Sequence, residues 1–310
     1  MLKVSQLCAS SSDLPGTLQL WSDLFGFANA GAQSLWGSTI RVQGLDQSDR
    51  GIVWWLVGTQ PFFQLEFFTH TKPAQRPLPD DWTPRDLGWV RCGITVADFD
   101  HSLSILERHG IPLLGAVVEV DGARRVAFRE PYIGCVVELF EDSETLPWRK
   151  HAAPALVYAT ASVSDLESAR AYYADLLGLE IAPLEQIHTP DHEAMWGLAG
   201  AGREGFLAWA GDVAIEVVRY QPAGRPRRPD YRVSDQGMVN IAFSSSDTSE
   251  IERLFDRLAD EGFVAPYLIR ADGFCGGYIN DPERETKFLS LEGAAADAGF
   301  SPAQPFITDL

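Results

Sequence analysis

Two stretches of the sequence share one order of features: VSQLCASSSDLPGTLQLWSDLFGF at residues 4–27 and LVYATASVSDLESARAYYADLLGL at residues 156–179. Each begins with the alternation of a strand and continues into the amphipathic pattern of a helix. Asp13 and Asp165 stand where helix N-caps are expected, and a glycine closes each helix. The chain therefore contains an internal repeat.

Two further copies of this pattern lie between and after the first pair, at residues 88–111 and 237–263. Turn-rich segments then lead into apolar strands, REPYIGCVVELFED at 129–142 and INDPERETKFLSLEG at 279–293. We predict four units, each made of one strand, one helix and three strands. The units begin near Val4, Trp89, Leu156 and Met238.

A single unit would expose one face of its sheet, so we expect the units to pair into curved, open barrels. Taking consecutive units as partners predicts an α+β protein with two barrel-like domains, residues 1–145 and 155–294. The turn-rich segment 145–154 is the predicted linker, and residues 295–310 are a predicted C-terminal tail packed on the surface. A ligand is expected inside one of the cups.

Composition restricts the function classes. The chain has 310 residues, and its 43 acidic and 25 basic residues give a net charge of −18. Such a surface repels phosphate backbones and anionic lipids, so we expect neither nucleic acid nor membrane partners. Four widely spaced cysteines and the lack of a signal-peptide pattern predict a cytoplasmic protein.

The motifs VSDLE…YY..LLGLE, D.G.VNIAF and EP…GCVVELFE resemble the vicinal oxygen chelate superfamily, over roughly residues 3–293. This superfamily includes glyoxalase I, bleomycin-resistance proteins, methylmalonyl-CoA epimerase and extradiol dioxygenases. The resemblance implies inward-facing positions on the first and last strand of each unit, which carry His, Gln or Glu in metal-binding members. Here these positions fall on Gln6, Arg91, Tyr158 and Asn240 in first strands and on Glu66, Glu138, Glu216 and Leu289 in last strands.

In the first half, the resemblance implies a divalent metal held by Gln6, Glu66 and Glu138. Arg91 takes the fourth position, and a guanidinium offers only donors, so it would repel a cation. Three interpretations stay open: a weak Mg²⁺ or Mn²⁺ site, a buried ion pair of Arg91 with Glu66 or Glu138, and an anion-binding role for Arg91.

In the second half, the iron ligands of the extradiol dioxygenases are replaced by Tyr158, Asn240 and Leu289, which disfavours ring cleavage. Glu216 remains, and burial in an apolar cup would raise its pKa and make it a general base. Tyr158 and Asn240 would then donate hydrogen bonds to a developing enolate oxygen. The alternative is a set of polar residues that pair with one another in a purely structural domain.

Several other residues are candidates for substrate contact. Aromatic side chains near the predicted cups favour an aromatic or otherwise apolar ligand. Two histidines flank an aspartate in a loop expected at the rim of a cup, where contact with a ligand or solvent is favoured over a metal site. The candidates are Trp54, Phe68, Trp196, Trp209, His188 and His192. The basic segment 225–232 would either hold a substrate carboxylate or phosphate or form a solvated loop.

Two functional hypotheses follow. The first is a lyase, isomerase or epimerase that moves a proton on an oxygenated, aromatic or carbonyl-bearing small molecule, with or without a divalent metal. The second is a binding protein that sequesters a small molecule, as bleomycin-resistance proteins do. Exposed sheet edges make a homodimer an additional expectation.

Overall fold

The computed structural model describes residues 1–271, 273–292 and 300–303. It confirms the four predicted units of one strand, one helix and three strands. The first unit comprises β1 (Lys3–Ser10), α1 (Leu14–Phe25), β2 (Ala28–Leu35), the short α2 (Ser38–Arg41), β3 (Arg50–Val57) and β4 (Gln64–Lys72). The second comprises β5 (Gly88–Val96), α3 (Phe99–Arg108), β6 (Val118–Val120), β7 (Ala123–Arg129) and β8 (Val136–Glu141).

The third unit has the most irregular helical segments. It comprises β9 (Ala155–Ser162), α4 (Leu166–Arg170) continued by the π-helix η1 (Ala171–Leu176), β10 (Glu180–Ala182), the 3-10 helices η2 (Leu184–Gln186) and η3 (Pro190–Trp196), β11 (Gly202–Ala210) and β12 (Val213–Gln221). The fourth comprises β13 (Gly237–Ser245), α5 (Thr248–Asp260), β14 (Leu268–Ala271), β15 (Phe274–Ile279) and β16 (Thr286–Ser290).

Aspartate caps start the main helix of each unit. The Asp13 carboxylate accepts from the Gly16 N–H of α1 at 3.2 Å, and Asp165 accepts from the Glu167 N–H of α4 at 2.9 Å. Asp98 and Asp247 cap α3 and α5 in the same way. Because these carboxylates satisfy N–H groups that the first helical turn leaves free, the repeated aspartate marks the strand-to-helix turn in every unit.

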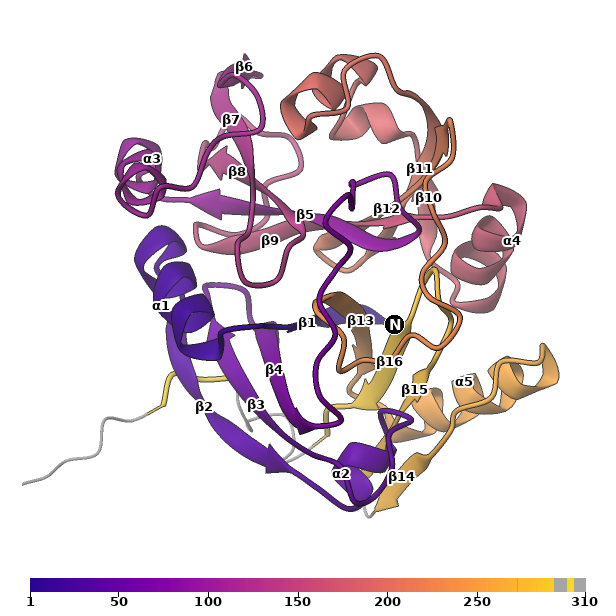
Figure 1. The fold of residues 1–310 in the computed structure, drawn as a ribbon. Helices are drawn as coiled ribbons and strands as arrows, with labels where there is room; N and C mark the ends of the chain where they lie inside the picture. The colour runs from indigo at the N-terminus through magenta and orange to yellow at the C-terminus, as the bar shows by residue number, and fades with distance from the viewer. Residues whose placement is uncertain (272, 293–299, 304–310) are drawn as a thin grey trace, which may run out of the picture.

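The units pair differently from the prediction. One eight-stranded sheet has the order β14-β15-β16-β13-β1-β4-β3-β2, and the other has the order β10-β11-β12-β9-β5-β8-β7-β6. The first and fourth units therefore share one sheet, the outer-unit sheet, and the second and third units share the inner-unit sheet (Figure 1). This corrects the predicted domains 1–145 and 155–294: each half of the chain contributes one unit to each sheet.

Each sheet has a helix-covered face and an opposite face, which we call its cup. Leu7 and Phe67 of the outer-unit sheet and Ile94 and Val217 of the inner-unit sheet belong to one apolar core on the helix side. Strand residues alternate between the faces, so polar residues between these apolar ones point into the cups. The two sheets thus share a core and carry two separate cups.

Two proline- and arginine-rich segments connect the sheets; we call residues 73–87 the first strap and residues 222–236 the second strap. Arg76 of the first strap binds Asp235 of the second at 2.6 Å, and Arg225 of the second binds Asp86 of the first at 2.8 Å. The backbone N–H of Leu87 also donates to the Arg225 carbonyl at 2.8 Å. These reciprocal contacts hold the straps against each other.

Most of the predicted tail, 295–310, lies outside the described residues. Within its described part, the Ala303 N–H donates to the Asn29 carbonyl of β2 at 2.7 Å, and Phe300 lies 6.4 Å from Phe62 between ring centroids. Residues 300–303 therefore pack on the first unit. No helix in the described part of the chain is both long enough and apolar enough to cross a membrane.

Candidate functional site

The pairing of the units distributes the predicted site residues between two cups. Gln6, Glu66 and Asn240 lie on strands of the outer-unit sheet, whereas Glu138 and Glu216 lie on strands of the inner-unit sheet. The predicted metal set of Gln6, Glu66 and Glu138 is therefore split and does not assemble. The predicted acid–base group of Glu216, Tyr158 and Asn240 is split in the same way, because Tyr158 lies on β9 of the inner-unit sheet.

Glu216 lies at the centre of the inner-unit cup and is fully buried. Its Oε2 is 2.5 Å from Arg91 Nη2 and accepts the Thr160 hydroxyl at 2.6 Å. Its Oε1 is 3.0 Å from Arg203 Nη1 and 2.8 Å from His188 Nδ1. The predicted partner of Arg91 was Glu66 or Glu138, so the structure confirms a buried ion pair for Arg91 but with a different carboxylate.

Glu138 is held in the same cup by a second set of donors. Its Oε1 is 2.8 Å from Arg125 Nε, and its Oε2 accepts the Tyr158 hydroxyl at 2.6 Å. The Trp196 indole N–H donates to Oε2 at 3.1 Å, and His188 Nε2 lies 3.2 Å from the same oxygen. One imidazole thus bridges the two buried carboxylates of the cup.

The arginine and histidine side chains around Glu216 and Glu138 determine the protonation of both carboxylates. Burial alone would raise the pKa of Glu216, but Arg91, His188 and Arg203 hold that pKa well below its usual range. Burial is likewise outweighed at Glu138, where Arg125 and His188 lower the pKa to about 2. The prediction that Glu216 has a raised pKa and acts as a base near neutral pH is therefore wrong.

The loop with the two histidines fills the inner-unit cup instead of standing at its rim. His188 is fully buried between the carboxylates, and Trp196 lies under the Arg91 guanidinium, 3.4 Å from it to the ring centroid. His192 Nδ1 accepts the Thr189 N–H at 2.9 Å and caps η3. Both histidines therefore have structural partners within the protein.

The outer-unit cup contains a cation of the protein itself. Lys287 Nζ lies 2.7 Å from Gln6 Oε1 and 3.2 Å from Glu66 Oε2. Glu66 also accepts the Cys8 thiol at 3.0 Å and the Trp55 indole N–H at 3.1 Å. The Lys287 ammonium therefore contacts two of the three side chains that were predicted to bind a metal, Gln6 and Glu66.

Lys287, and not Leu289, occupies the last-strand position of the fourth unit. Lys287 pairs with Ala242, two residues after Asn240, just as Glu138 pairs with Gly93, two residues after Arg91. The turn after Pro282 is two residues shorter than the corresponding turn after Pro131, and this difference shifted the prediction to Leu289. Counting the turn length was the available signal.

Two unpartnered polar side chains lie beside each other in the outer-unit cup. Ile241 of β13 pairs with Thr286 of β16, so the preceding residues, Asn240 and Glu285, are neighbours on the cup face. Among the described residues, both amide atoms of Asn240 and Oε1 of Glu285 are buried without a hydrogen-bond partner. Buried polar groups are normally satisfied, so this pair points to a bound molecule.

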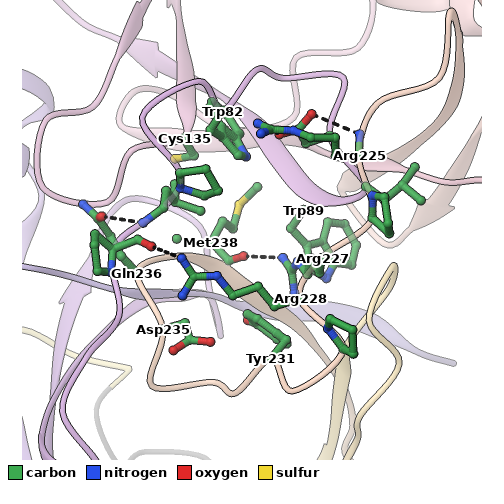
Figure 2. Close-up of a pocket in the computed structure, with 18 residues that line it drawn as sticks. Trp82, Trp89, Cys135, Arg225, Arg227, Arg228, Tyr231, Asp235, Gln236 and Met238 are labelled. Atoms are coloured by element: carbon green, nitrogen blue, oxygen red, sulfur yellow. Dashed lines mark hydrogen bonds and ion pairs between the residues drawn. The ribbon is translucent and has the colours of Figure 1, made fainter.

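The second strap covers this end of the cup. A cavity of about 220 Å³ is lined by Glu285, Asn280, Tyr231 and Arg227. A larger cavity of about 400 Å³ lies between the two straps and shares Arg227 and Tyr231 with it (Figure 2). Arg227 thus stands between two adjoining cavities.

The other predicted substrate residues are distributed over several places. Trp54 is directed away from the cup, where its indole N–H donates to Asn29 Oδ1 at 2.8 Å, and Trp55 takes the cup position instead. Phe68 lies in an apolar cluster of the outer-unit cup. Trp209 donates to Gln186 Oε1 at 3.2 Å beside η2. Glu285, Arg125 and Arg203 were not predicted as site residues, because no local feature of the sequence marks them.

Neither cup has a donor set that fits a divalent metal. In the outer-unit cup an ammonium lies at the carboxylate, and in the inner-unit cup three guanidinium groups surround Glu138 and Glu216. Within the described ranges, no group of three or more His, Cys, Asp and Glu side chains is arranged to hold a metal ion. Because like charges repel, these fixed cations oppose the binding of a metal ion at either set of carboxylates.

Residues 155–285 match the model of the Glyoxalase/Bleomycin resistance protein/Dioxygenase superfamily. This match spans the third unit and the fourth unit up to its last strand. At the level of sequence, no curated protein matches the chain.

Solved structures extend the fold of this superfamily to the whole chain. A glyoxalase I mutant from Zea mays is 14% identical with a TM-score of 0.62, and the match covers 96% of this chain and 94% of that one. A proposed dioxygenase from Bacillus subtilis subsp. subtilis str. 168 is 14% identical with a TM-score of 0.61, covering 93% and 84%. At this identity the similarity establishes the fold and leaves the reaction open.

Proposed function

We propose that the chain is an enzyme of small-molecule metabolism that moves a proton on an oxygenated substrate at the outer-unit cup, without a metal ion. Glu285 is the proposed group that exchanges the proton. The observation that carries the proposal is the buried Glu285, which lines a cavity and whose Oε1 has no partner among the described residues, next to the equally unpartnered amide of Asn240. The match of residues 155–285 to the superfamily model supports small-molecule chemistry in general.

Burial raises the pKa of Glu285 to about 8, although the nearby Arg227 opposes this shift. A proton-transfer group works best when its pKa lies near the operating pH, because both protonation states are then populated. Among the buried carboxylates described above, Glu138 and Glu216 are locked in the ionised form, whereas Glu285 is free to change state. This difference supports Glu285 as the acid–base group.

The proposed step is an enolisation. The Glu285 carboxylate takes a proton from a carbon next to a carbonyl group, and the electron pair of that C–H bond moves toward the carbonyl oxygen. The Asn240 amide donates a hydrogen bond to this oxygen as negative charge develops there. Return of the proton to the same or to a neighbouring atom completes an exchange, an epimerisation or an isomerisation.

The test is deuterium exchange followed by proton NMR in D₂O, with phenylpyruvate as an aromatic probe and 2-oxobutyrate as a small one. We expect the wild type to accelerate exchange of the protons next to the carbonyl. In Glu285→Gln this acceleration should be at least about 100-fold smaller. Glu261→Gln, at an exposed position of the same unit, should keep it. No acceleration by the wild type, or equal rates for Glu285→Gln, would overturn the proposal.

The second candidate is a small-molecule binding protein. Lys287 in the outer-unit cup and the filled inner-unit cup favour it, because a binder tolerates replacement of catalytic ligands. Recovery of phenylpyruvate unchanged from a stoichiometric complex, with no exchange, would select this function. The homodimer and the cytoplasmic location are likewise proposals that rest on the sequence.

A further inference from the structure

We infer that the cavity between the two straps binds a flat, apolar or aromatic molecule that carries one carboxylate, with Arg227 as its principal anchor. Binding of such a ligand can be tested by itself; the additional statement that it belongs to the substrate rests on the proposed function. The basic segment 225–232 then holds a carboxylate, which is the first of the two roles that the sequence left open for it.

Two arginines beside this cavity make no ion-pair contact with the described residues. Its two lining aspartates are already paired, Asp86 with Arg225 at 2.8 Å and Asp235 with Arg76 at 2.6 Å. Within the described part of the chain, neither Arg227 nor Arg228 has a carboxylate within ion-pair distance. In a chain of net charge −18, two arginines beside an apolar cavity that make no ion pair with the described residues are complementary to an anion.

Arg227 is held in place before any ligand arrives. Its Nη2 donates to the Met238 carbonyl at 2.9 Å, and its guanidinium lies 4.2 Å from the centroid of the Tyr231 ring (Figure 2). Nη1 is buried and has no partner among the described residues. A guanidinium that is fixed through one nitrogen and keeps an unpartnered N–H on another can bind a carboxylate with little further loss of side-chain entropy.

The backbone makes room for this arrangement at one glycine. Gly88, at the start of β5, has φ +111, and a Cβ at this position would lie 2.3 Å from Arg227 Nε. Any larger residue would therefore displace the guanidinium. The position of Arg227 thus depends on the junction between the first strap and the inner-unit sheet.

The walls of the cavity match a flat apolar group. Trp82 and Trp89 come from the first strap and β5, and Tyr231 and Met238 come from the second strap and β13 (Figure 2). Aromatic rings provide large apolar contact surfaces, and about 400 Å³ is within the range of small-molecule sites. The cavity therefore combines an aromatic lining with an anchored positive charge.

The test compares trans-cinnamate with the uncharged trans-cinnamamide by isothermal titration calorimetry on the full chain. We expect the wild type to bind cinnamate at least about 10-fold more tightly, the effect of one charge-assisted hydrogen bond. Arg227→Met should abolish this preference and Arg227→Lys should retain part of it. Arg253→Met, which changes an exposed arginine of α5 that lines neither of the two cavities, should leave it unchanged.

Equal affinity for the two compounds, no binding of either, or the same loss of the preference for cinnamate in Arg253→Met would overturn the inference. The Lys variant separates a lost anchor from a folding defect, because it keeps a positive charge on a long side chain. Calorimetry requires no turnover, so cinnamate binding without deuterium exchange would retire the proposed function and leave this inference standing. Deuterium exchange without a preference for cinnamate over cinnamamide would retire this inference and leave the proposed function standing.

Discussion

The ammonium of Lys287 lies 3.2 Å from Glu66 Oε2, at the strand position that carries glutamate in the other three units. Glu66, Glu138 and Glu216 hold the corresponding positions of β4, β8 and β12. The fourth unit therefore supplies a cation where its relatives within the chain supply an anion. This exchange of sign explains why the outer-unit cup needs no metal to neutralise Glu66.

Reversing that exchange should create a metal site. Lys287→Glu places a second carboxylate beside Glu66 and Gln6, and hard divalent ions favour such oxygen ligands. We expect this variant to bind about one equivalent of Mn²⁺ by calorimetry, whereas Lys287→Gln, which only removes the ammonium, should bind none tightly. Stoichiometric Mn²⁺ binding by the wild type that Glu66→Gln abolishes would contradict the assignment of Lys287.

Removal of one cation from the inner-unit cup should destabilise the protein strongly. Arg91→Met leaves Glu216 buried with one ion-pair partner fewer, and breaking a buried pair costs about 3–5 kcal/mol. Arg124→Met, which breaks the partly exposed pairs with Asp100 and Glu141, should cost less than about 1 kcal/mol per pair. Urea unfolding measures the free energy of unfolding of both variants. Equal decreases in the two variants would show that the cup network adds little stability.

The buried Glu285 carboxyl predicts how stability depends on pH. Its folded pKa of about 8 exceeds the unfolded value of about 4.3, so the folded state binds a proton that the unfolded state has released. The contribution to the free energy of unfolding is complete below about pH 4 and is lost as the pH rises to about 8.

Glu285→Gln removes this dependence. Its stability relative to the wild type should therefore increase between pH 5 and pH 8.5, by about 1.4 kcal/mol for each unit of the pKa difference that is crossed. Urea titrations at the two pH values measure the change. A constant difference between variant and wild type would show that Glu285 has an ordinary pKa.

The sequence repeat predicted the units well because each unit carries its own local signals. Alternating strands, an aspartate N-cap such as Asp13 or Asp165 and a closing glycine depend only on neighbouring residues. The correct first-strand positions Gln6, Arg91, Tyr158 and Asn240 followed from counting back from these caps. The superfamily resemblance was therefore recognisable from the chain alone.

The pairing of the units depends on contacts distant in sequence, and no local signal encodes it. Lys3 of the first unit pairs with Ser244 of the fourth, and no sequence feature near either residue indicates this partner. The wrong pairing then placed Glu138 with Glu66 and separated Arg91 from Glu216. Cup residues such as Arg125 and Arg203 lie on middle strands, where only the assembled sheet shows that they reach the buried carboxylates.

The observed pairing predicts how fragments of the chain behave. Residues 1–147 and 155–310 each contain one unit of each sheet, so neither fragment completes a cup. We expect the two fragments, when co-expressed, to copurify as a 1:1 complex with the stability profile of the intact chain. Each fragment folding alone as a stable monomer would instead support consecutive pairing of the units.

The most direct test of the proposed site is the titration of Glu285 itself. The charged and titratable groups near its carboxyl include Arg227 and Tyr231 of the second strap, Asp281 of the preceding turn, Cys8 of β1 and Tyr278 of β15. Carbon-13 NMR of protein labelled at the glutamate side-chain carboxyl should show one resonance, absent from Glu285→Gln, that titrates with a midpoint near pH 8. A midpoint near pH 4 for that resonance would contradict the account, because Glu285 would then be a permanently ionised group without a proton to exchange.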